Sequence, residues 1–138
     1  MILVSGCLLG FNVKYNGKNN KNQKIIDYLK DKEYKVICPE TMGGLKSPRL
    51  PAERKGGRVY KKDGEDVTDY FLKGAEKVLL IAKECGADIA ILKQSSPSCG
   101  YGKIYDGTFS DTKIKGMGVT AEILSENGIK ILTEEDFD

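Results

Sequence analysis

Three of the four cysteines, Cys7, Cys38 and Cys99, stand at the end of an apolar run, where a glycine or a proline marks a turn. The runs that precede them span residues 1–4, 34–37 and 88–93. If these runs form neighbouring parallel strands, their carboxyl ends meet at one edge of the sheet, which is where α/β proteins usually bind ligands. The sequence therefore predicts that three thiols converge on one site.

The chain has no histidine, which removes the commonest acid/base group and the imidazole metal ligand. Chemistry at this edge must then use thiolates, carboxylates, hydroxyls, Lys, Arg or Tyr. An all-thiolate ligand set prefers a soft metal ion or a metal cluster. The fourth cysteine, Cys85, precedes Gly86 at the expected end of a helix, so we expect it to be a small buried hydrophobe rather than a ligand.

Length and charge place limits on the class of protein. The 138 residues predict a single domain over residues 1–138 with one core. The 22 Lys and Arg against 20 Asp and Glu give a formal charge of +2, which predicts no nucleic-acid partner. Residues 3–7 look like the tail of a lipoprotein signal, but such a signal needs an apolar stretch of roughly 7–15 residues. Four cysteines without an export signal predict a reducing compartment, the cytoplasm, and no membrane partner.

The elements that position the cysteines alternate between strand and helix. We expect strands at residues 2–6, 34–37, 88–93 and 129–132 and helices ending near 32, near 86 and at 126. Thr68 or Asp66 is the expected cap of the long middle helix. Its inner face is predicted to carry Phe71, Leu72, Ala75, Val78, Leu79 and Ala82. This order predicts a three-layer, Rossmann-like α/β domain with a mainly parallel sheet.

Residues 41–57 contain many glycines and prolines and few apolar residues, which predicts a long loop without regular structure. Loops of this length are more often binding walls or lids than idle connections. Arg49, Glu53 and Arg54 would supply it with charged groups that close over a pocket, although an exposed loop with scattered charges has the same composition. A short extended piece or hairpin is expected at residues 58–60 with the turn at Asp63-Gly64.

Several linked motifs occur in order along nearly the whole chain. They are Ser5-Gly6-Cys7-Leu8-Leu9-Gly10; Cys38-Pro39-Glu40 with Gly43-Gly44-Leu45 and Pro48-Arg49-Leu50-Pro51; Gly64 through Gly74-Ala75; Lys93 with Ser95-Ser96-Pro97-Ser98-Cys99-Gly100; and Ile104-Tyr105-Asp106-Gly107 with Phe109. With these motifs the chain resembles the thiouracil desulfidase family of small bacterial proteins. One departure is Lys14-Tyr15-Asn16-Gly17, where the family typically has Arg-Tyr-Asp-Gly.

The resemblance implies a [4Fe–4S] cluster held by Cys7, Cys38 and Cys99, with the fourth iron left without a protein ligand. In the family that iron takes the sulfur of a small thiolated base such as 2-thiouracil, and the ring carbon is hydrolysed to the oxo base with release of sulfide. The family's catalytic residues correspond to Glu40 and Ser96. We also expect the substrate to be contacted by two further residues, Ser98 and Arg49.

The residues themselves agree with this implication. Clusters of this type normally use four thiolates, so a site with three leaves one position open, and an open position favours catalysis over a structural role. Pro39 fixes the backbone just after Cys38, which tethers Glu40 near the site as the candidate base for an attacking water. Ser96 is expected to hydrogen-bond the ring or the developing anion, although serines in turns also bond nearby backbone amides.

Other classes of site stay open on the sequence alone. Zinc sites usually show cysteines in close pairs, whereas these cysteines lie tens of residues apart. Cys99 is also a candidate nucleophile for a thiol-dependent transferase, but it has no histidine as a partner. A non-catalytic iron–sulfur or nucleotide-binding module, or a sulfur carrier, would use the same crevice. Iron content distinguishes these alternatives.

Overall fold

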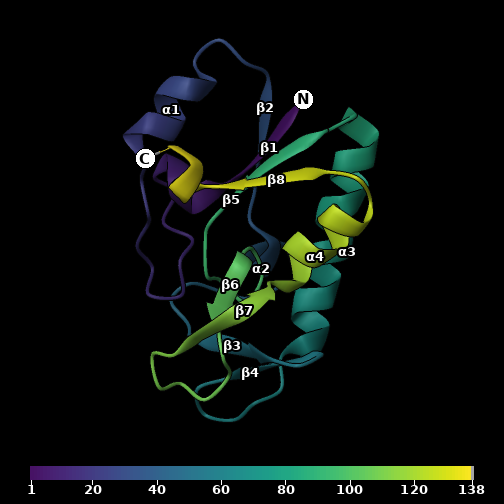
Figure 1. The fold of residues 1–138 in the computed structure, drawn as a ribbon. Coiled ribbons are helices and arrows are strands. Elements are labelled where there is room, and N and C mark those ends of the chain that lie inside the picture. Colours follow the sequence, from purple (N-terminus) through teal and green to yellow (C-terminus); the bar gives the residue numbers. More distant parts are fainter. Residues whose placement is uncertain (138) are drawn as a thin grey trace.

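Four parallel strands form the centre of the molecule in the computed structural model, which describes residues 1–137 (Figure 1). In spatial order they are β2 (Tyr34–Ile37), β1 (Ile2–Ser5), β5 (Ile89–Leu92) and β8 (Lys130–Thr133). The central strand β1 pairs with both of its neighbours, so that Ile2 lies opposite Tyr34 on one side and Ile89 on the other. The predicted parallel sheet is confirmed. Asp138, the last residue of the predicted domain, lies outside the described residues.

Helices cover both faces of this sheet (Figure 1). α1 (Gln23–Leu29) packs on the face that carries Val4, whereas α3 (Thr68–Cys85) and α4 (Val119–Glu126) pack on the face that carries Leu3. Successive strand residues point to opposite faces, so the continuous apolar runs of β1 and β5 bury both sides, as a parallel sheet between two helical layers requires. The predicted three-layer α/β arrangement is confirmed.

The long helix α3 buries a stripe at helical spacing that contains Phe71, Ala75, Val78 and Ala82. It ends where Gly86 adopts the left-handed conformation, with φ at 66°. The prediction for Leu72 was wrong: this side chain is 40% exposed, because it lies about 100° around the helix from its buried neighbour. The N-cap residue is Val67, and Asp66 accepts a hydrogen bond from the backbone N–H of Thr68 at 2.9 Å.

Among residues 1–137, no helix combines the length and the apolar character that crossing a membrane requires.

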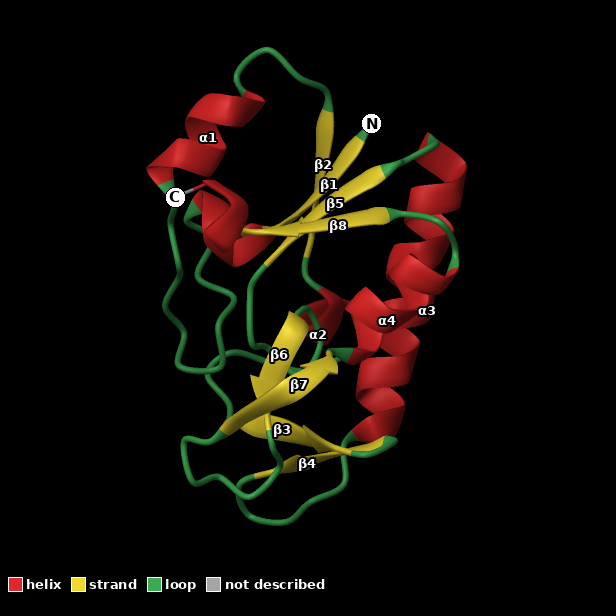
Figure 2. Cartoon of the chain, in the orientation of Figure 1, coloured by secondary structure: helices red, strands yellow, loops and turns green. Residues whose placement is uncertain are grey.

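Two antiparallel hairpins lie below the sheet in Figure 2. β3 (Ala52–Lys55) pairs with β4 (Arg58–Lys61), and β6 (Tyr101–Tyr105) pairs with β7 (Lys113–Met117). The predicted loop over residues 41–57 is therefore confirmed only for residues 43–51, because α2 ends at Met42 and β3 occupies residues 52–55. The expected extended piece after residue 58 is β4, and its hairpin turns between residues 55 and 58. These strands are rich in Lys, Arg and Gly and bury only isolated apolar side chains, so they show no apolar alternation that sequence reasoning can detect.

A short helix, α2 (Pro39–Met42), follows β2, and its backbone packs directly against that of α3. A Cβ atom on Gly74 would lie 1.9 Å from the carbonyl oxygen of Pro39, and a Cβ atom on Gly43 would lie 2.0 Å from the carbonyl oxygen of Tyr70. Only glycine permits this approach. The contact holds α2 in place, together with the residues at its start, Cys38 and Glu40.

Candidate active site

A cavity of about 550 Å³ lies at the carboxyl ends of the central strands. Its lining includes Cys7 in the 3-10 turn η1 (Gly6–Leu9) after β1, Cys38 directly after β2, and Cys99 in the turn that follows β5. The sheet order brings these residues together, because β2, β1 and β5 are direct neighbours that end at one edge. Cys85 does not line this cavity; it ends α3 and packs against the core.

The three thiols of the cavity differ in burial and interact electrostatically. Cys99 is 5% exposed, whereas Cys7 and Cys38 are partly exposed. Burial raises the pKa of Cys99 and of Cys7, and negative charge on Glu40 and on the other two thiols raises the pKa of Cys99 further. A bound cation or cluster compensates thiolate charge and favours the deprotonated ligands.

Each of these thiols also has a polar side-chain partner. The pairs are Ser5 with Cys99 at 3.5 Å, Asn20 with Cys7 at 3.5 Å, and Thr41 with Cys38 at 3.2 Å. Sequence reasoning missed all three partners. The three-residue spacing of Cys38 and Thr41 could have predicted their contact. Nothing in the sequence marks Ser5 and Asn20, because only the fold brings them to a sulfur atom.

Glu40 lines the cavity at the start of α2 and is paired with Arg49. The distance from Arg49 Nη2 to Glu40 Oε2 is 3.4 Å. Burial raises the pKa of Glu40, and the charge and hydrogen bond of Arg49 oppose that rise. Arg49 itself is 9% exposed, does not line the cavity and also donates to the carbonyl oxygen of Val13 at 3.3 Å. The structure therefore places Arg49 beside Glu40 and outside the residues that line the cavity.

The two predicted serines have different surroundings. Ser96 lines the cavity, and its Oγ accepts hydrogen bonds from the backbone N–H groups of Ser98 and Cys99, both at 3.0 Å. Its own hydroxyl proton has no acceptor among residues 1–137. Ser98 is fully buried, lies outside the cavity lining and shares a hydrogen bond of 2.9 Å with Thr120. The structure thus brings Ser96 to the cavity and leaves Ser98 in the core.

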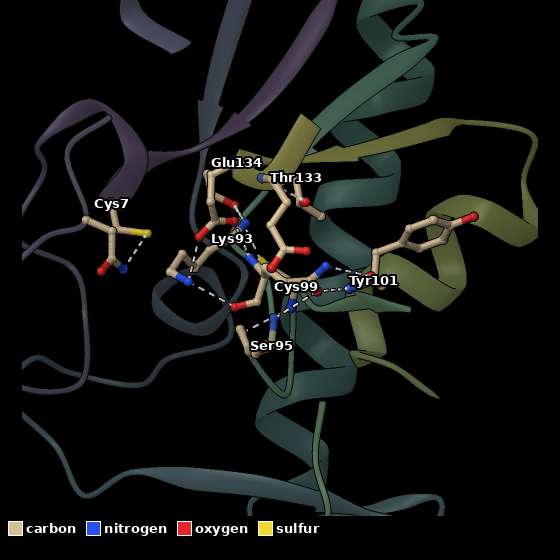
Figure 3. Close-up of polar contacts among 12 residues, drawn as sticks. Cys7, Lys93, Ser95, Cys99, Tyr101, Thr133 and Glu134 are labelled. Carbon is tan, nitrogen blue, oxygen red and sulfur yellow. Dashed lines mark hydrogen bonds and ion pairs between the residues drawn. The ribbon is translucent and has the colours of Figure 1, made fainter. Parts of the chain in front are cut away.

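Lys93 and Glu134, which both line the cavity, form an ion pair that sequence reasoning missed (Figure 3). Lys93 Nζ lies 2.6 Å from Glu134 Oε2, and Glu134 Oε1 accepts a hydrogen bond from the backbone N–H of Gln94 at 2.7 Å. Lys93 is close enough for its charge to lower the pKa of Cys7, against the larger effect of burial. The network holds the chain after β5, where Ser95 adopts a left-handed φ of 67°.

The hairpins and the loop after η1 supply the outer wall. Glu53 lines the cavity and accepts hydrogen bonds from the backbone N–H groups of Gly107 and Phe109 at 3.0 and 3.1 Å, which ties the two hairpins together. Arg54 points away from the cavity to Glu122, at 2.6 Å. In the segment that departs from the family pattern, Asn16 is exposed and accepts a hydrogen bond from a backbone N–H within its own turn.

Comparison with known proteins decides the family. The family model described as 2-thiouracil desulfurase matches residues 2–136. The chain belongs to the 2-thiouracil desulfurase family. This confirms the resemblance that its motifs indicated.

Two relatives of this desulfurase-family chain cover nearly all of it. The uncharacterized protein YbbK of Bacillus subtilis (strain 168) is 44% identical over an alignment of 146 residues. The alignment covers 99% of this chain and 97% of that protein. The solved structure of the [4Fe-4S]-dependent thiouracil desulfidase TudS is 41% identical, with a TM-score of 0.93, over 98% of this chain and 91% of that chain.

The chemistry of the cavity's donor set is compatible with a soft metal ion or an iron–sulfur cluster. Cys7, Cys38 and Cys99 line one cavity, and iron–sulfur clusters are held by cysteine thiolates. Among the described residues no group of three or more Cys, Asp or Glu side chains is gathered closely enough to hold a single metal ion.

Proposed function

We propose that this protein is a [4Fe–4S]-dependent desulfidase that hydrolyses a thiolated pyrimidine, such as 2-thiouracil, to the oxo base and sulfide. The observation that carries the proposal is the shared cavity: three cysteines line it together with Glu40 and Ser96, in a chain of the 2-thiouracil desulfurase family. Cys7, Cys38 and Cys99 would hold the cluster. The cavity of about 550 Å³ lies within the usual range for small-molecule sites.

When bound, the cluster supplies a Lewis-acidic iron for the thiocarbonyl sulfur, which makes the ring carbon electrophilic. Glu40 activates the attacking water by accepting its proton on the carboxylate. The new C–O bond forms, and the C–S bond breaks with its electron pair on sulfur. The protons of the water leave with the sulfide, so no electrons are gained or lost overall. Arg49 orients the Glu40 carboxylate for this task, since its guanidinium lies 3.4 Å away.

Ser96 stabilises charge that develops on the ring during the same step. Its Oγ is already fixed by two backbone donors, at 3.0 Å each. Its remaining proton is therefore free to donate to the substrate, and a well-placed donor of this kind contributes about 3–4 kcal/mol to transition-state stabilisation. The turn geometry and the catalytic role are compatible, because the turn uses the lone pairs of the hydroxyl and the reaction uses its proton.

The test is anaerobic reconstitution with iron and sulfide, followed by absorbance and electron paramagnetic resonance spectra and by measurement of sulfide release from 2-thiouracil. We expect the wild-type chain to take up a cluster and to turn over. Glu40→Gln should keep the cluster spectrum and lose about 10²–10⁴-fold in turnover. Glu135→Gln is the matched control, because Glu135 lies at the rim of the same cavity and pairs with Lys103 at 2.8 Å. A wild-type chain that binds no iron would refute the proposed function, and full turnover by Glu40→Gln would refute the role of Glu40.

A further inference from the structure

Asn20 holds Cys7 at two points, and no step of the proposed reaction uses it. Its backbone N–H donates to the carbonyl oxygen of Cys7 at 2.8 Å, and its side-chain Nδ2 donates to Cys7 Sγ at 3.5 Å. Asn20 lies thirteen residues after Cys7 and lines the same cavity. One residue thus contacts both the backbone and the sulfur of a proposed ligand.

The loop around Asn20 is anchored on both sides, so the amide is presented in a fixed direction. Before it, Asn19 Nδ2 donates to Asn12 Oδ1 at 2.9 Å. After it, the backbone N–H of Asn22 donates to the carbonyl oxygen of Leu8 at 2.8 Å, and the Asn22 side chain caps α1. A donor that is already oriented loses little entropy when it binds the sulfur.

The chemistry of the donor matters as much as its position. An amide NH₂ is neutral and only donates from its nitrogen, so toward a thiolate it stabilises negative charge on sulfur. Hydrogen bonds to the ligand sulfurs are one of the factors that set the reduction potential of an iron–sulfur cluster. Residues that orient a metal ligand typically change metal affinity 10- to 100-fold when they are replaced.

The partners of the other two thiols differ from Asn20. Ser5 Oγ accepts the backbone N–H of Lys93 at 3.3 Å while it donates to Cys99, so it also has a structural role within the sheet edge. Thr41 lies three residues after Cys38, and its Oγ1 accepts a hydrogen bond from the Cys38 thiol. Asn20 is the amide donor of the set, and its partner sulfur is partly exposed.

We propose that Asn20 is a positioning residue for Cys7. Its two hydrogen bonds hold Cys7 in the orientation that binds iron, and the side-chain bond to Sγ stabilises the reduced, more negatively charged form of the bound cluster. This inference rests on the proposed function, because it assigns Asn20 a role toward the cluster that Cys7 helps to hold.

The test compares Asn20→Ser and Asn20→Asp with wild type, each reconstituted anaerobically as the holoprotein. Two properties are measured: the midpoint potential of the cluster, by titration followed with electron paramagnetic resonance, and the rate of iron loss to a chelator. Asn20→Ser, whose side chain is too short to reach the sulfur, should have a more negative potential and should lose iron about 10-fold faster. Asn20→Asp keeps the size of the side chain but replaces the donor with a carboxylate, so it should shift both properties further in the same direction.

Asn19→Ser is the matched control, since Asn19 lies in the same loop and bonds to Asn12 rather than to a thiol. It should behave as wild type in both measurements. If Asn20→Ser does not fold, the measurements on Asn20→Asp test the inference, because the aspartate side chain has nearly the same shape as asparagine. A potential and an iron-loss rate that match wild type in the folded Asn20 variants would overturn this inference and leave the desulfidase proposal intact. A wild-type chain that takes up no iron would overturn both.

Discussion

Replacing Gly74 with alanine tests the contact between α2 and α3 that places Cys38 and Glu40 at the cavity. A Cβ atom at position 74 would lie 1.9 Å from the carbonyl oxygen of Pro39, whereas ordinary contacts begin at 3.4 Å, so α2 must move away by about 1.5 Å. Overpacking of this kind costs about 1–3 kcal/mol, while alanine adds about 1 kcal/mol of helix propensity over glycine. We expect Gly74→Ala to lose up to about 2 kcal/mol in the free energy of unfolding.

The same displacement should damage the proposed chemistry more than the fold. A misplacement of about 1 Å costs roughly 10²-fold in rate, so sulfide release by reconstituted Gly74→Ala should fall about 100-fold. Urea unfolding of the metal-free protein measures the stability, and sulfide release from 2-thiouracil measures the rate. Gly57→Ala is the matched control, because no atom lies within 4 Å of a Cβ atom at that position and its φ suits an ordinary residue.

The sign of the stability change decides whether this reasoning holds. Without the clash, helix propensity alone would act, and alanine at position 74 would raise the urea midpoint. A stabilised Gly74→Ala protein with wild-type turnover would therefore show that α2 does not depend on contact with α3.

Two further predictions concern Ser96 and Asp66. Ser96→Ala leaves the backbone N–H groups of Ser98 and Cys99 without their acceptor, so the urea-derived stability should fall by about 1–3 kcal/mol; an unchanged stability would contradict the turn role that we assign to this hydroxyl. The pKa of Asp66 is lowered from its usual 3.8 to about 2, first by its hydrogen bonds with Thr68. Because this pKa is lower in the folded state, the carboxylate stabilises the fold above about pH 4, and that contribution is lost as the pH falls toward 2. The urea midpoint of wild type should therefore drop more than that of Asp66→Asn between those pH values, and parallel curves would argue against the shifted pKa.

Local pattern was enough to predict the elements that carry the cysteines. The apolar runs before Cys7, Cys38 and Cys99 form β1, β2 and β5, and the last helix spans the expected residues, Val119–Glu126. Apolar periodicity and helix stop signals are short-range properties of the chain, so these elements can be read without knowledge of their neighbours. The alternation of strands and helices then predicted that the strands run parallel to one another.

Tertiary structure decided which polar side chains belong to the site. Ser98 and Ser96 are two residues apart in one turn, yet one hydroxyl is in the core and the other at the cavity. Ser5 meets a sulfur atom 94 residues away, and Glu134 reaches back to Lys93. The local sequence around a polar residue does not indicate its hydrogen-bond partner, because that partner depends on where the packed strands and hairpins end. The cysteines could therefore be found in the sequence, whereas the side chains that hold and orient them could not.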